Sequence, residues 1–116
     1  PRLRIVLGHL GETLPLLLDR FDNRYRWQRE LFGFKGTERL PGEYFRENFV
    51  VTTSGMNYAA PLTATLEALG PDKVLFAADF PMEVQKDAVD ELEAIAIPAD
   101  VKRRIFDTNP ARVFRL

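Results

Sequence analysis

The sequence contains no cysteine and only one histidine, His9. The lack of cysteine excludes both a disulfide framework and a thiolate metal site. No apolar run approaches the roughly 20 residues that a membrane span requires, and no secretory signal peptide is recognisable. The formal net charge is -1, so a strongly basic surface for nucleic acid is also lacking. We expect a cytoplasmic protein without a nucleic-acid or membrane partner.

The length and the hydrophobic content of the chain fit one domain or a part of one. The sequence has 116 residues, of which 46% are hydrophobic, and this is enough to form a core. An apolar segment of strand-like composition begins almost directly after Pro1. We therefore expect residues 1–116 to be a single segment of a larger protein, with the N-terminal part of its domain absent.

Three short apolar segments, rich in β-branched residues, have the composition of parallel strands that are buried on both faces. They lie at residues 3–7, 49–53 and 73–78. Helical patterns separate and follow them, so the predicted order is β-α-α-β-α-β-α-α, which is typical of an α/β fold with right-handed crossovers. A complete (β/α)₈ barrel needs about 250 residues. Three strands alone would leave two open sheet edges and an uncovered inner face.

The helical patterns have recognisable boundaries. Pro15 fits the first turn of a helix whose apolar residues begin at Leu14, and Gly70 is predicted to end a helix over 61–69. The residues from Gly33 to Gly42 indicate a loop, followed by one short helical turn at 43–48. Two further helices are predicted at 84–94 and 99–107. Asn109-Pro110 is predicted to end the second of these, before a short helical or irregular piece.

Charged and aromatic residues alternate between Arg20 and Arg29, around Tyr25 and Trp27. One interpretation is an amphipathic helix on the surface. Another is a protein–protein interface, because Trp, Tyr and Arg are favoured interface residues. A nucleic-acid patch is disfavoured, since neighbouring Asp and Glu residues offset the positive charge.

Titratable residues follow two of the predicted strands, and functional groups of α/β folds lie at the carboxyl ends of parallel strands. His9 follows the first strand, with Glu12 close behind, and Asp79 follows the third. An imidazole and a carboxylate at one rim can share a proton or a divalent metal. The alternatives are a structural histidine, an aspartate that caps the next helix, and a glutamate that interacts with a helix dipole.

Four ordered motifs make the sequence similar to a known family: Gly-His-Leu-Gly-Glu at 8–12, Phe-Val-Val-Thr-Thr-Ser-Gly at 49–55, Ala-Asp-Phe-Pro-Met-Glu at 78–83 and Asn-Pro-Ala-Arg-Val-Phe at 109–114. Together they resemble the C-terminal part of the amidohydrolase-2 family. That family includes metal-dependent non-oxidative decarboxylases that act on γ-resorcylate, 5-carboxyvanillate or aminocarboxymuconate semialdehyde. The resemblance implies the last three βα units of a distorted (β/α)₈ TIM barrel.

The resemblance also implies roles for individual residues. Asp79 matches a ligand of the catalytic Zn or Mn, and His9 matches a histidine that acts in proton transfer. Glu12 matches the acidic partner of that histidine, which orients the imidazole or raises its basicity. Arg20 matches an arginine that reaches the substrate carboxylate across a subunit interface, a task that suits a guanidinium fork. Asn57 is expected to line the substrate pocket.

The implied activity is that of a metal-dependent carboxy-lyase that acts on an o-hydroxy aromatic acid, in a homodimer or homotetramer. The alternatives are a hydrolase or hydratase of the same family and a non-catalytic module. Phe80 and Met82 stand where the family more often has tyrosine and phenylalanine, which would alter the pocket shape. The metal motif of the family's first strand and the ligating histidine of its fifth strand are not in the sequence. We therefore expect the 116-residue chain alone to be inactive.

Overall fold

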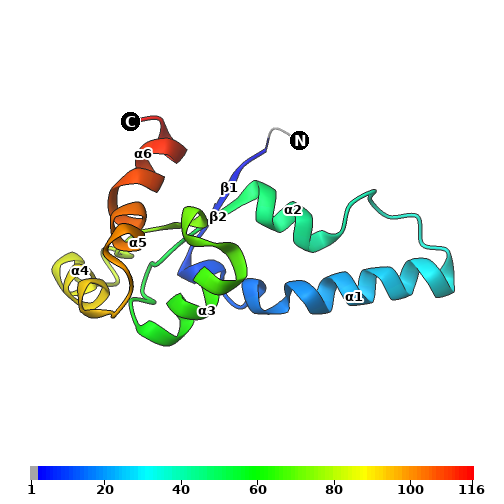
Figure 1. Ribbon diagram of the computed structural model, residues 1–116, viewed down its shortest axis with the longest axis horizontal. Coiled ribbons are helices and arrows are strands. Elements are labelled where there is room, and N and C mark those ends of the chain that lie inside the picture. Colours follow the sequence, from blue (N-terminus) through cyan, green and yellow to red (C-terminus); the bar gives the residue numbers. More distant parts are fainter. Residues whose placement is uncertain (1–2) are drawn as a thin grey trace.

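The computed structural model describes residues 3–116 and confirms an α/β fold (Figure 1). The strands lie at the centre, with the long helix α1 extending to one side and helices α4 to α6 on the other. In chain order the elements are β1 (Ile5–Leu7), the 3₁₀ turn η1 (His9–Gly11), α1 (Leu14–Phe32), α2 (Pro41–Asn48), β2 (Phe49–Thr52), α3 (Ala59–Leu69), the 3₁₀ turn η2 (Pro71–Lys73), β3 (Val74–Leu75), α4 (Gln85–Ala94), α5 (Ala99–Arg103), the π-helical turn η3 (Arg104–Thr108) and α6 (Asn109–Phe114).

The three strands form one parallel sheet in the order β1-β2-β3. Its register pairs Leu7 with Val51, and Val51 in turn with Val74. The prediction of three parallel strands is therefore confirmed. Each strand is shorter than its predicted range, because regular strand pairing covers only a part of each segment.

The core lies between one face of the sheet and the helices. Val51 and Val74 are fully buried and belong to the same apolar cluster as Leu62 of α3, Leu92 of α4 and Ile105 of η3. Burial of each such side chain contributes about 1.5–3 kcal/mol relative to exposure.

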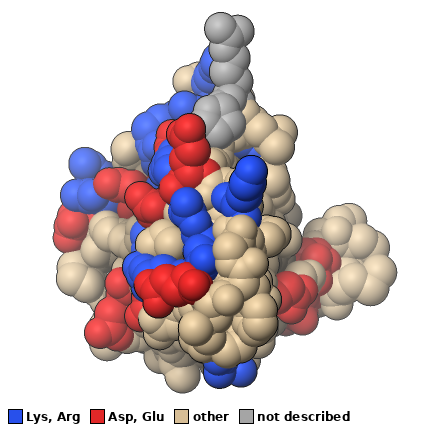
Figure 2. Space-filling model, turned by 90° about the vertical axis from the view of Figure 1, so that its right-hand side faces the viewer, with Lys and Arg blue, Asp and Glu red and all other residues tan. Residues whose placement is uncertain are grey.

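Helix α1 is much longer than the part of it that packs on the sheet. Leu18 near its start is buried, whereas Trp27, Leu31 and Phe32 near its end are exposed. This extension accounts for a molecule of 51 × 29 × 28 Å (Figure 1). Figure 2 looks onto this side of the molecule, and there Lys and Arg residues lie beside Asp and Glu residues instead of forming a patch of one sign. No helix within residues 3–116 combines the length and the apolar composition needed to cross a membrane.

Helix α2 begins at Pro41 and is longer than the single turn predicted at 43–48. The N-terminal N–H groups of a helix need acceptors, and two side chains supply them here. The buried carboxylate of Asp22 on α1 accepts a hydrogen bond from the Gly42 N–H at 2.7 Å. The Glu43 carboxylate accepts one from the Leu40 N–H at 2.8 Å. The predicted loop therefore ends at Leu40, and Asp22 ties α2 to α1.

The predicted helix end at Asn109-Pro110 is wrong. Helix α5 continues without a gap through the turn η3 and α6 to Phe114, and we call this continuous segment the last helix. The turn η3 has π-helical hydrogen bonding, so the Asn109 N–H bonds to the Arg104 carbonyl five residues back. In that register the Ile105 carbonyl faces residue 110, and Pro110 has no N–H to donate. The proline leaves the Ile105 carbonyl available to another donor without breaking the helix.

The outer edge of β3 was predicted to be open, and this is also wrong. The Ile105 carbonyl accepts a hydrogen bond from the Phe76 N–H at 2.9 Å. Two residues before Phe76, the Val74 carbonyl on the same edge accepts a hydrogen bond from the Asn109 side-chain amide at 2.8 Å. Backbone groups that would pair with a neighbouring strand therefore bind the last helix instead. The other edge, along β1, has no strand partner within the described residues, and Val6 there is 44% exposed.

Candidate functional site at the carboxyl ends of the strands

His9 lies two residues after the end of β1, in the turn η1. Its backbone φ is +50°, and Leu10 and Glu12 also have positive φ values of 51° and 56°. Such conformations cost non-glycine residues about 1–3 kcal/mol each. The buried side chain of Leu10 anchors the turn in the core. The sequence thus places the only imidazole of the chain in a turn that core packing holds in a strained conformation.

The His9 ring is held by the loop that follows β2. Its Nδ1 lies 2.8 Å from the carbonyl oxygen of Ser54. Because a carbonyl oxygen only accepts hydrogen bonds, Nδ1 carries the hydrogen in this pair. In the neutral imidazole the lone pair is then on Nε2. Nε2 is therefore the atom that can take up a proton and return it.

Thr53 at the end of β2 is 0% exposed, and it bonds to the strand that leads to Asp79. Its hydroxyl donates to the Ala77 carbonyl at 2.9 Å and accepts from the Ala77 N–H at 3.1 Å. The neighbouring Thr52 and Ser54 hydroxyls lie 2.8 Å apart. The end of β2 therefore contacts both the His9 turn and the Asp79 segment.

Asp79 lies in a turn with a backbone φ of 71°. Its carbonyl accepts hydrogen bonds from the N–H groups of Met82 at 2.8 Å and Glu83 at 3.2 Å. Gly55 lies against its carboxylate: a Cβ at position 55 would be 3.6 Å from Asp79 Oδ2 and 3.6 Å from Glu83 Oε1. A methyl group at position 55 would therefore be in van der Waals contact with both carboxylates.

This arrangement fits part of a divalent-metal site. Carboxylate oxygens bind Mn and also Zn. Within residues 3–116, however, no group of three or more histidine or acidic residues lies close enough together to hold a metal ion. A firmly bound catalytic metal takes at least three protein ligands. Asp79, with Glu83 beside it, therefore fits a donor set that other residues must complete.

Glu12 lies on the same turn as His9 and is exposed. Its backbone N–H donates to the His9 carbonyl at 2.9 Å. Among the described residues, the side-chain hydrogen bond of the imidazole is with Ser54, and Glu12 takes no part in it. The orienting role predicted for the Glu12 carboxylate thus stays a prediction.

Arg20 lies on α1, away from the strand ends. It borders an open hollow of about 410 Å³ together with Asn23, Arg24 and Trp27. No residue at the carboxyl end of a strand lines that hollow. Neither His9 nor Asp79 borders the hollow in which Arg20 lies.

Asn57 is buried in the loop after β2, and its Oδ1 has no hydrogen-bond partner within residues 3–116. It borders an open hollow of about 490 Å³, of which Glu91 and Ile95 on the α4 side form another wall. That hollow contains neither His9 nor Asp79. The role of Asn57 at the substrate pocket stays a prediction.

The sequence interpretation gave no role to Thr53, Ser54 or Glu83. Glu83 was not among the candidate residues, yet its carboxylate lies as close to position 55 as that of Asp79 does. Thr53 is the last residue of the strand predicted at 49–53 and Ser54 follows it, at the rim where His9 and Asp79 were placed. Their position was the signal available in the sequence, but hydroxyl side chains are common in turns and did not by themselves indicate a partner.

Comparison with known proteins places the chain in a family. The amidohydrolase family profile matches residues 1–116. The γ-resorcylate decarboxylase of Rhodococcus jostii (strain RHA1) is 39% identical over 116 residues, which are 100% of this chain and 35% of that protein. The chain therefore spans about a third of the length of this relative.

Solved structures of decarboxylases are similar to this chain as well. The 5-carboxyvanillate decarboxylase from Sphingomonas paucimobilis matches with a TM-score of 0.93 and 41% identity, over 100% of this chain and 35% of that one. A dihydroxybenzoic acid decarboxylase from Polaromonas sp. JS666, with bound manganese and the inhibitor 2-nitroresorcinol, matches with a TM-score of 0.82 and 34% identity, over 98% of this chain and 34% of that one. The three parallel strands and their helices correspond to a part of the TIM barrel of such decarboxylases. By sequence and by structure, the chain belongs to the amidohydrolase family.

Proposed function

We propose that residues 1–116 form the C-terminal part of the barrel of a metal-dependent decarboxylase, which removes the carboxylate of an o-hydroxy aromatic acid without oxidation. The observation that carries this proposal is the rim itself: His9 is held by Ser54, and the segment leading to Asp79 is held by the adjacent Thr53. The decarboxylases named above share this fold over their matching third. The remaining strands would come from the rest of a longer polypeptide.

Asp79 is the proposed metal ligand of this part of the barrel. Its oxygens suit either Mn or Zn, and the Polaromonas decarboxylase contains manganese. When bound, the metal would supply Lewis-acid chemistry to the aromatic acid, and Asp79 would be one of the residues that hold it. Asp79 contributes a charged oxygen whose position is fixed by the strand before it.

His9 is the proposed proton carrier. The Ser54 carbonyl keeps the hydrogen on Nδ1, so Nε2 takes up the mobile proton. The imidazolium gives this proton to the ring carbon that bears the carboxylate. The electrons of the breaking carbon–carbon bond then return to the ring, CO₂ leaves, and the ring becomes aromatic again. Glu12, on the same turn, is proposed to raise the basicity of the imidazole.

Arg20 is proposed to bind the substrate carboxylate of a neighbouring subunit in a homodimer or homotetramer. Its position on α1, in a hollow that contains neither His9 nor Asp79, supports this role. The exposed aromatic residues Trp27 and Phe32 at the far end of α1 support a protein interface there. Light scattering of the complete polypeptide tests this proposal. We expect a dimer or a tetramer, and a monomer at micromolar concentration would contradict the cross-subunit role of Arg20.

Three further side chains are proposed as pocket walls. Phe80 and Met82, which follow Asp79, are 78% and 81% exposed and would present apolar surface to an aromatic ring. Asn57 would contribute a polar group, and its unpartnered buried Oδ1 supports a ligand-binding role.

The function is tested with the complete polypeptide that contains residues 1–116. The protein is stripped of metal, reconstituted with Mn²⁺ or Zn²⁺, and offered a panel of o-hydroxybenzoates while CO₂ release is measured. We expect release from at least one member with metal and none without it. We expect the 116-residue chain alone to release no CO₂, because it lacks most of the donor set. Absence of CO₂ release by the reconstituted polypeptide from every member would contradict the proposed function.

A further inference from the structure

The hydroxyl of Thr53 replaces a backbone group in the sheet. The ladder between β2 and β3 pairs Val51 with Val74 and Thr52 with Leu75, and it continues with a bond from the Thr53 N–H to the Leu75 carbonyl at 3.0 Å. In a regular parallel ladder the next bond would join the Ala77 N–H to the Thr53 carbonyl. That carbonyl instead accepts from the Met56 N–H at 2.8 Å, where the chain turns away after β2.

The side chain of Thr53 compensates for this loss. Its hydroxyl accepts from the Ala77 N–H at 3.1 Å and donates to the Ala77 carbonyl at 2.9 Å. Both polar groups of residue 77 are thereby satisfied by one oxygen atom. A hydroxyl is suited to this because it donates and accepts at once. The sheet contact extends two residues past β3, to within two residues of Asp79.

The same short segment also holds the proposed proton carrier. Ser54, the residue after Thr53, accepts the hydrogen bond from His9 Nδ1 at 2.8 Å. Gly55, the next residue, leaves the space beside the Asp79 carboxylate. Three consecutive residues therefore contact the His9 ring on one side and the Asp79 segment on the other. A displacement of the Ala77 peptide would move Asp79 relative to the His9 turn, which would still be held by its hydrogen bond to Ser54.

We propose that Thr53 is a positioning residue for Asp79, so that its hydroxyl determines metal affinity without touching the metal. This proposal rests on the proposed function, in which Asp79 is a metal ligand. The competing explanation is that Thr53 only fills the core. Valine has the same shape as threonine, and it would fill the core equally well while leaving the N–H and carbonyl of Ala77 without partners.

The test compares three variants of the complete polypeptide. Thr53→Val removes the hydroxyl, and Thr53→Ser retains it. Thr65→Val is the matched control, because Thr65 is also buried but lies on α3. Free Mn²⁺ is measured by electron paramagnetic resonance during titration of the metal-free protein, and the thermal midpoint of each variant is recorded.

We expect Thr53→Val to raise the Kd for Mn²⁺ by about 10- to 100-fold, the usual effect of losing a group that supports a metal ligand. Thr53→Ser should stay within about threefold of the wild type, and Thr65→Val should lower the thermal midpoint without changing the Kd. A wild-type Kd in Thr53→Val would overturn the proposal, even if its thermal midpoint falls. If the wild-type polypeptide itself binds neither Mn²⁺ nor Zn²⁺, the proposed function fails, which is a separate result.

Hydrogen exchange provides a second measurement that does not require the variant to fold. In the metal-free wild-type polypeptide, the Ala77 amide should exchange slowly, like the ladder amide of Thr53. Exchange of the Ala77 amide at the rate of the exposed loop that begins at Phe80 would show that the hydroxyl does not hold it, and this would overturn the proposal.

Discussion

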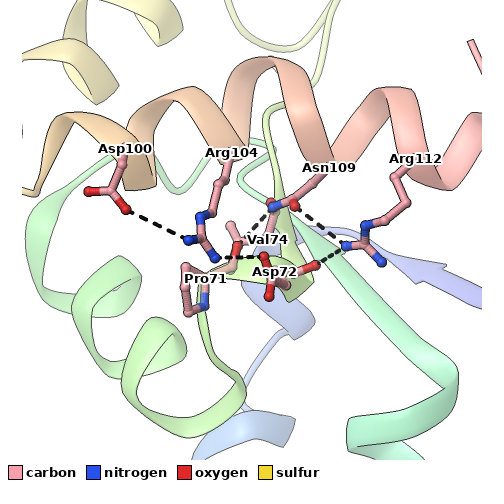
Figure 3. A network of polar contacts seen from close by, with 7 residues as sticks. All are labelled: Pro71, Asp72, Val74, Asp100, Arg104, Asn109 and Arg112. Atoms are coloured by element: carbon pink, nitrogen blue, oxygen red, sulfur yellow. Dashed lines mark hydrogen bonds and ion pairs between the residues drawn. The ribbon is translucent and has the colours of Figure 1, made fainter.

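The two ends of β3 are built differently. At the amino end, the Asn109 amide donates to the carbonyls of Pro71 and Val74, both at 2.8 Å, and Arg112 donates to the Asp72 carbonyl (Figure 3). At the carboxyl end, beyond Ala77, the hydrogen bonds of Asp79 are confined to its own turn. The amino end of β3 is bound to distant parts of the chain, whereas its carboxyl end leads to the Asp79 carboxylate beside Gly55.

This difference separates stability from binding. Asn109 is 1% exposed, and it joins residues that lie 35 and 38 positions away in sequence. Such bonds hold the last helix on the sheet. Barrel enzymes carry their chemistry at the carboxyl ends of strands, while the amino ends serve the scaffold. We therefore expect substitutions at the amino end to change the free energy of unfolding, and substitutions at the carboxyl end to change metal affinity.

The largest effect is expected for Asp79→Asn, which removes the charge of the proposed ligand. In the complete polypeptide we expect the Kd for Mn²⁺ to rise by at least about 100-fold, since an amide is a much weaker ligand than a carboxylate. The matched control is Asp72→Asn at the opposite end of β3, which should leave the Kd unchanged. Equal effects of the two substitutions in a metal titration would remove the distinction between the two ends.

Asn109→Ala should have the largest effect on stability. It leaves the buried Val74 carbonyl and the part-buried Pro71 carbonyl without their donor, and a buried group without a partner costs about 1–3 kcal/mol. We expect the free energy of unfolding of the complete polypeptide to fall by about 3 kcal/mol, measured by urea denaturation. The Kd for Mn²⁺ should stay unchanged at temperatures where the variant is folded. A loss below about 0.5 kcal/mol would show that Asn109 does not secure the sheet edge.

Gly55→Ala should affect both properties moderately. Gly55 has a φ of +66°, so alanine costs about 1 kcal/mol in backbone strain. Its methyl group would also enter the space beside the Asp79 and Glu83 carboxylates. Gly33→Ala is the matched control, because Gly33 has a similar φ of +61° but nothing within 4 Å of the added carbon. Both variants should lose similar stability, and only Gly55→Ala should weaken Mn²⁺ binding. Equal Mn²⁺ affinities would exclude a metal from that space.

Arg104→Ala should have the smallest effect. The Arg104 guanidinium lies 2.9 Å from the Asp72 carboxylate at the amino end of β3, and both side chains are partly exposed to solvent (Figure 3). Exposed ion pairs contribute about 0–1 kcal/mol and are screened by salt. We expect a loss of less than 1 kcal/mol in urea denaturation at low ionic strength, and a smaller loss at high ionic strength. A loss as large as that of Asn109→Ala would mean that the charged pair, and not the buried amide, holds this end.

The sequence predicted the elements well where the pattern is local. Alternating strands and helices, the first turn at Pro15 and the helix end at Gly70 all follow from patterns within a few residues. The covered edge of β3 was missed because it depends on two features that no local pattern reveals. One is a π-helical turn, and the other is a proline that leaves the Ile105 carbonyl available to Phe76.

The site was predictable to a similar extent. His9 and Asp79 were placed at one rim by the rule that parallel strands end together. The attachments of that rim were not predictable, since Thr53 contacts a residue 24 positions away and Ser54 contacts one 45 positions away. Their partners depend on the register of the sheet, which the apolar composition of these strands does not determine.

A crystal structure of the complete polypeptide with Mn²⁺, with the metal located from its anomalous scattering, tests the central claim most directly. We expect a manganese peak within coordination distance of an Asp79 carboxylate oxygen, in the space beside Gly55, with the Ala77 peptide bonded to the Thr53 hydroxyl. A peak bound elsewhere, or an Asp79 side chain turned away from the metal, would contradict the assignment of the carboxyl end of β3 as the metal-binding end.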